Sequence, residues 1–113
     1  MQKSKSFNSK NSKAESKTPD ESEIDYHFSL FIVGDELNSS IAKKNLNMFC
    51  KNHLEDNYKI EIINILNDYK KALQYKIFIT PALVIRRNHS SLVIYGNLNE
   101  TDKMLSILDI KGD

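Results

Sequence analysis

The sequence predicts an α/β domain in which a mixed sheet lies between layers of helices. An aromatic segment, a helical segment and an isoleucine-rich segment follow one another in the first half of the chain, as expected of a βαβ unit. In the second half, the pair Thr80-Pro81 interrupts an apolar run that leads into two short strands and a helix. The predicted order of elements is therefore βαβ-α-ββα in three layers.

The first strand is predicted at residues 26–33, where aromatic and β-branched side chains form a short apolar run. The strand should end at the turn formed by Gly34 and Asp35. A helix should follow, because short polar side chains at its start can accept hydrogen bonds from unpaired helical amides. The candidates for this cap are Asn38, Ser39 and Ser40.

The helix after this cap should have one apolar and one polar side. Residues 58–66 alternate and are rich in isoleucine, which predicts a second strand. Two strands joined through a helix of this length are expected to be parallel, with a right-handed crossover. The apolar side of the helix should carry Ile41, Leu46, Phe49, Cys50 and Leu54, and the polar side Lys43, Lys44, Asn47 and Lys51.

The second half of the chain is expected to contain a short helix, a hairpin and a last helix. Residues 69–75 can form two helical turns after a cap at Asn67 or Asp68. Residues 82–85 and 92–95 should be the two strands of a hairpin. The last helix should begin at Asn99 or Thr101 and bury Met104, Leu105, Ile107 and Leu108.

Pro81 needs an explanation, because proline lacks a backbone donor and does not fit inside a central strand. One interpretation is a cis Thr80–Pro81 bond at the turn into a strand, since X-Pro is the common cis peptide. The alternative is an ordinary trans proline before an edge strand. A Thr-Pro pair that opens the third strand is typical of thioredoxin-like folds, which share the element order predicted above.

Composition limits the domain organisation and the partners. Residues 1–23 contain six Ser, five Lys and four acidic residues and almost no apolar side chains, so we expect a disordered tail before a folded domain at residues 24–113. The formal net charge of +1 gives no reason to expect nucleic acid as a partner. No apolar run is long enough to predict a membrane helix. A single cysteine favours a reducing, cytoplasmic setting.

Residues that could carry catalysis are few. A thioredoxin-type enzyme needs a cysteine where the first helix begins, because the helix dipole there lowers the thiol pKa, and residues 34–40 contain none. Cys50 is expected to pack on the apolar side of the helix instead. Cys50 and His53 could form half of a metal site, but no second pair has matching spacing. We therefore expect neither an enzyme nor a cofactor or metal.

A series of motifs runs through most of the chain. It begins with Leu30-Phe31-Ile32-Val33-Gly34, followed by Asn38-Ser39, and includes the isoleucine-rich strand Ile60-Glu61-Ile62-Ile63-Asn64-Ile65-Leu66. It continues through Lys76-Ile77-Phe78-Ile79-Thr80-Pro81-Ala82-Leu83 and Ile94-Tyr95-Gly96-Asn97-Leu98. Through these motifs, from about Phe28 to Ile110, the chain resembles the KaiB family. The spacing from Gly34 to Thr80-Pro81 to Gly96 fits the family without a gap.

This resemblance implies a non-enzymatic clock protein that binds the ring ATPase KaiC. Members of the family form homo-oligomers and can adopt two folds, a tetrameric ground state and a thioredoxin-like monomer that binds the KaiC ring. For one sequence to populate two folds, the free energies of the two folds must differ by only about a few kcal/mol. By position, the resemblance assigns partner binding to Ile60, Glu61, Asn64 and Lys76, and a structural cis proline to Thr80-Pro81.

The chain also departs from the family pattern. Glu61 stands where cyanobacterial members have a basic residue, and Asn64 replaces an acid. A reversed charge in an interface mainly changes specificity and association rate, so the partner could be a divergent KaiC. Two alternatives stay open: a thioredoxin-like sensor or adaptor domain that binds another signalling protein, and a redox protein.

Removal of residues 1–23 should leave the folded domain intact, because this segment has almost no apolar surface to contribute. We expect the truncated chain to melt within a few degrees of the full chain, the shift that corresponds to less than about 1 kcal/mol for a domain of this size. Thermal unfolding followed by circular dichroism measures this. Loss of cooperative unfolding would show that the segment is part of the domain.

Overall fold

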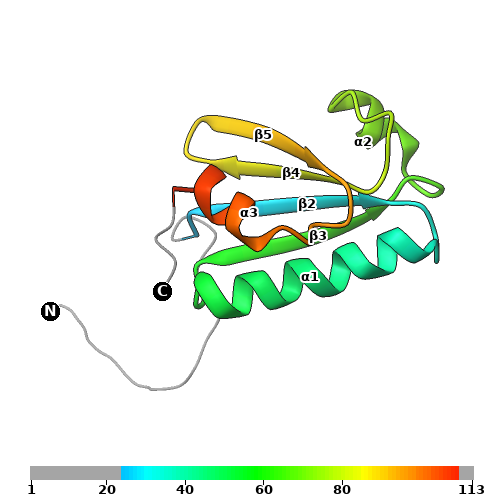
Figure 1. Ribbon diagram of the computed structural model, residues 1–113. Coiled ribbons are helices and arrows are strands. Elements are labelled where there is room, and N and C mark those ends of the chain that lie inside the picture. Colours follow the sequence, from blue (N-terminus) through cyan, green and yellow to red (C-terminus); the bar gives the residue numbers. More distant parts are fainter. Residues whose placement is uncertain (1–23, 110–113) are drawn as a thin grey trace, which may run out of the picture.

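The structure is a computed structural model in which residues 24–109 are described. The predicted tail at residues 1–23 lies outside the described residues, as do residues 110–113. Four strands form one sheet in the order β3-β2-β4-β5 (Figure 1). The elements follow the predicted βαβ-α-ββα order, and the predicted α/β class is confirmed.

The sheet is built on the central strand β2, Tyr26–Ile32. On one side β2 pairs in parallel with β3, Tyr58–Asn64, as the βαβ pattern predicted. On its other side β2 pairs antiparallel with β4, Ala82–Arg87. A turn then leads to β5, Ser90–Tyr95, which completes the predicted hairpin at the sheet edge.

Two helices cover one face of the sheet. They are α1, Leu37–His53, and α3, Thr101–Ile107 (Figure 1). Their apolar sides enclose the larger core together with alternate residues of the strands, because successive strand residues point to opposite faces. This core contains Phe28, Leu30, Ala42, Leu46, Phe49, Cys50, Leu83, Ile85, Met104, Leu105 and Leu108 among its buried members.

The third helix, α2, Tyr69–Gln74, lies on the opposite face (Figure 1). A smaller core connects it to the sheet, and Phe31 lies at its centre. The Tyr75 ring meets the Phe31 ring edge-on, with ring centroids 5.9 Å apart. The other buried members are Ile63, Ala72, Ile77, Ala82 and Val84.

Several local predictions were wrong. Helix α1 begins earlier than expected and is capped by Glu36, whose carboxylate accepts from the Ser39 backbone N–H at 3.1 Å. Ser39 is fully buried, and its hydroxyl has two partners there: it donates to Glu36 and accepts from the Val33 amide. At α3, Ile107 is 36% exposed, so it does not share the buried side predicted for it. Asp68 caps α2 as predicted.

The hairpin is also tighter than predicted. The strands extend to Arg87 and begin again at Ser90, which leaves only Asn88 and His89 as the turn. Asn88 has a φ of 57°, a left-handed conformation that asparagine tolerates better than most residues. Strand β4 starts directly after the Thr80–Pro81 peptide bond, which is cis. The Pro81 carbonyl accepts a hydrogen bond from the Gly96 amide at 2.9 Å.

Candidate protein-binding surface

The four residues expected to bind a partner do not lie on one surface. Ile60 and Glu61 are neighbours on β3 and therefore point to opposite faces of the sheet. Ile60 packs against the larger core under α1. Glu61 lies on the face that carries α2, whereas Lys76 follows the end of that helix.

Glu61 holds α2 against the edge strand. Its carboxylate accepts a hydrogen bond from the Lys71 ammonium at 2.8 Å, and both side chains remain partly exposed. This hydrogen bond raises the pKa of Lys71. The pair lies in solvent, so its main effect is to orient the helix rather than to stabilise the fold. Glu61 is therefore already engaged within the chain.

Asn64 joins two loops at the end of β3. Its side-chain carbonyl accepts from the Gly34 amide at 3.1 Å and from the Leu66 amide at 3.1 Å. Its backbone carbonyl accepts from the amides of Asn67 and Asp68, which lead into α2. The half-buried Asn64 side chain thus fixes the β2–α1 loop against the β3–α2 loop. This contribution is structural.

Lys76 lies just after the end of α2 and has a left-handed backbone conformation, with φ at 58°. Glycine usually occupies such a position, because other residues pay for the close approach of Cβ and carbonyl. The backbone amides of Lys76 and Ile77 donate to carbonyls within the helix, at 3.0 and 2.8 Å, so the turn is closed. The Lys76 side chain is exposed. It is free to meet a partner.

The structure reveals a group of exposed apolar side chains that sequence reasoning missed. Phe78 is 76% and Ile79 66% exposed, although both lie in the apolar run before Thr80-Pro81. The helix itself adds Tyr69 and Leu73 on the side away from the sheet. We call this group the α2 surface: Leu66, Tyr69, Leu73, Phe78 and Ile79.

The α2 surface has the composition of a protein-binding site. Five large apolar side chains within fourteen residues are unusual on a solvent-exposed segment, and such groups mark interaction sites. The same stretch of chain carries Lys71, which pairs with Glu61, and the exposed Lys76. The sequence does contain a signal for this group. Phe78 and Ile79 are large apolar residues that lie between the predicted helix at residues 69–75 and Thr80-Pro81, so they belong neither to that helix nor to the strand that follows.

Cys50 lies where catalysis is chemically unfavourable. The side chain is fully buried in the larger core, near the C-terminal end of α1. Burial raises the pKa of the Cys50 thiol to about 12, so the reactive thiolate is scarce at neutral pH. Asp35, Glu36 and Leu37 occupy the start of α1, where a thioredoxin-type nucleophile would stand.

Within residues 24–109, no three His, Cys, Asp or Glu side chains come together as a metal site. None of the helices in this same region is long and apolar enough to cross a membrane.

These features define a class: a thioredoxin-like domain whose helix start lacks a cysteine. The class is supported by solved structures that share the fold at low sequence identity. The thioredoxin of Fasciola hepatica superposes with a TM-score of 0.64 at 14% identity, over 80% of this chain and 86% of that one. Mitochondrial thioredoxin 3 of Saccharomyces cerevisiae gives a TM-score of 0.63 at 13% identity, over 78% and 81%.

Sequence comparisons show the family to which the chain belongs. The family model for the KaiB domain matches residues 29–110. The chain is 35% identical to circadian clock protein KaiB3 of Synechocystis sp. over 81 residues, 72% of this chain and 79% of the relative. It is 29% identical to circadian clock oscillator protein KaiB of Cyanothece sp. over 75% of this chain and 81% of that protein. The chain belongs to the KaiB family, and the resemblance read from its motifs is confirmed.

Replacement of Asn64 tests the joint between the two loops. Asn64→Ala removes the acceptor of two backbone amides, so we expect a loss of about 1–2 kcal/mol in the free energy of unfolding. Asn64→Asp keeps an acceptor oxygen at the same place and should be close to neutral or stabilising. Urea unfolding of both variants measures the difference. Equal stabilities for Asn64→Ala and Asn64→Asp would contradict the joint.

The chain should also lack thiol-disulfide exchange activity, because its one thiol is buried and protonated. Insulin should not be reduced by the protein in the presence of dithiothreitol faster than by dithiothreitol alone. Alkylation of Cys50 by iodoacetamide should be slow in the folded protein and fast in urea. Insulin reduction that disappears in Cys50→Ser would overturn this expectation.

Proposed function

We propose that this chain is a non-enzymatic regulatory protein that binds a KaiC-type ring ATPase through the α2 surface. Family membership and the two relatives, both named as circadian clock proteins, support a role in a clock or in a related timing or stress-signalling system. The observation that carries the proposal is the exposure of Phe78 and Ile79 beside α2.

The α2 surface can act as the apolar centre of an interface. Aromatic and aliphatic side chains that lose all contact with water on binding supply most of the affinity of a protein interface. Phe78 is the most exposed side chain in this group and belongs to a loop fixed at both ends, by Ile77 in the smaller core and by Pro81 before β4. A fixed anchor loses little conformational freedom when it binds.

The charged border should control specificity. Lys76 presents a positive charge next to Phe78, and Lys71 and Glu61 form a pair nearby. Charges at the rim of an interface mainly change the association rate and exclude wrong partners. The acid at position 61 therefore favours a ring partner whose matching charge differs from that of cyanobacterial KaiC.

The same apolar side chains give a reason for self-association. A second copy of the chain could cover the α2 surface when no ring partner is present, in a dimer or tetramer. The family resemblance also implies that the chain can switch between two folds, and this switch is part of the same proposal. Sedimentation of wild type and of Phe78→Ser at several concentrations tests it: the variant should remain monomeric where wild type associates.

Ring binding is tested by titration of the protein against a KaiC-type ATPase from the same organism. Phe78→Ser should weaken binding by about tenfold or more, since an anchoring aromatic contributes more than about 1.4 kcal/mol. Lys76→Glu should slow association without a loss of stability, because both residues share the same left-handed backbone cost. Surface plasmon resonance separates the two rate constants.

Met48→Ser is the matched control for this titration. Met48 is a large apolar side chain on α1, 52% exposed, on the opposite side of the sheet from α2. Its replacement should leave ring binding unchanged. If Phe78→Ser and Lys76→Glu bind as tightly as wild type, the α2 surface is not the interface. If the wild-type chain binds no KaiC-type ring, the proposed function is wrong.

A further inference from the structure

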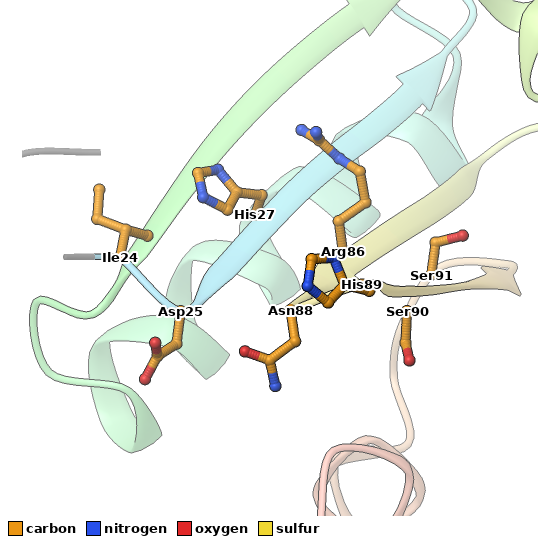
Figure 2. A pocket seen from close by; sticks show the side chains of 8 residues that line it. All are labelled: Ile24, Asp25, His27, Arg86, Asn88, His89, Ser90 and Ser91. Atoms are coloured by element: carbon orange, nitrogen blue, oxygen red, sulfur yellow. The ribbon is translucent and has the colours of Figure 1, made fainter. Parts of the chain in front are cut away.

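A polar hollow lies at the other end of the sheet face that carries α2. Its volume is about 550 Å³. The hollow opens where β2 begins and where the β4–β5 hairpin turns (Figure 2). Its walls are polar, and they include Asp25, His27, Arg86, His89, Ser90 and Ser91.

Three of these side chains are brought together by the register of the sheet. His27 on β2 is paired with Arg86 on β4, and Arg86 is paired with Ser91 on β5. Paired residues of neighbouring strands point to the same face and lie about 5 Å apart. Figure 2 shows all three side chains on one side of the sheet. Lys59 on β3 continues this row beyond His27.

No carboxylate among the described residues forms an ion pair with the Arg86 guanidinium in this hollow. In the described part of the chain, the Arg86 guanidinium makes no hydrogen bond or ion pair. The nearby acid, Asp25, accepts from the Asn57 side-chain amide at 3.0 Å, and its carboxylate points away from Arg86 (Figure 2). Arg86 therefore presents its donors to the hollow, next to an imidazole and a serine hydroxyl.

We propose that this hollow binds a tetrahedral dianion of the phosphate class through Arg86, His27 and Ser91. A guanidinium offers a planar fork of donors that matches two oxygens of such an anion, and the hydroxyl and imidazole can donate to the others. The source of the anion is either free phosphate or a phosphate monoester. The site lies on strands β2, β4 and β5 and is independent of the α2 surface.

Two imidazoles lie beside Arg86. Both His27 and His89 line the hollow, and an imidazole N–H can donate a hydrogen bond to an anion. The charged groups in this region are Arg86, Lys59 and Asp25. Asp25 is the one carboxylate among the described residues that line the hollow.

A titration of the full chain with sodium sulfate, followed by nitrogen-15 NMR, tests the site. Sulfate is a tetrahedral dianion, as the proposed site requires. Saturable shifts are expected for His27, Arg86 and Ser91, beyond those caused by sodium chloride at equal ionic strength. Parallel titrations with inorganic phosphate and with O-phosphoserine show which source binds more tightly.

Two variants and one control complete the test. Arg86→Gln should weaken sulfate binding by about tenfold or more. The double variant His27→Ala, His89→Ala should also weaken sulfate binding, because it removes both imidazole donors. Lys44→Gln removes an exposed charge on α1 and should bind as wild type does. The absence of saturable shifts, or Arg86→Gln and Lys44→Gln variants with equal affinity, would overturn the proposal.

Discussion

The pairing of β2 with two neighbours of opposite direction is the constraint on which the rest of this structure depends. The strand is buried on both faces, with Leu30 and Phe31 fully inaccessible. Its parallel edge fixes β3, and its antiparallel edge fixes β4. Because a parallel partner can be reached only through a long crossover, the chain must place α1 between β2 and β3. All three helices are then positioned by strands whose register β2 determines.

The antiparallel edge also places the two candidate sites at opposite ends of one sheet face. At one end Phe31 on β2 supports the smaller core, and the residues that follow α2 leave Phe78 and Ile79 in solvent. At the other end no helix within residues 24–109 covers His27 and Arg86, and the hollow lies between the start of β2 and the hairpin turn (Figure 2). Because α2 is too short to cover the whole face, both of the proposed binding surfaces fit on one small domain.

Most of the fold could be predicted from the sequence, because it depends on local patterns. The alternation in residues 58–66, the apolar side of α1 and the turn after Gly34 are each visible within a few residues. The candidate sites could not be predicted in the same way. The bond between Glu61 and Lys71 depends on how α2 packs on the sheet. The row from His27 to Ser91 joins residues that only the sheet register brings together. The Glu36 cap was missed because Ser39, a better capping residue by type, is buried and used elsewhere.

Native-state hydrogen exchange measures most directly whether the second half of the chain is built on β2. Amides of β2 and β4 that bond to each other should exchange only through global unfolding, with equal free energies of opening. Amides in β3 that bond to β2 should belong to the same cooperative unit. If β4 and β5 exchange much faster than β2, β3 and α1, the hairpin opens as an independent unit. That result would contradict a sheet in which one central strand holds both of its neighbours.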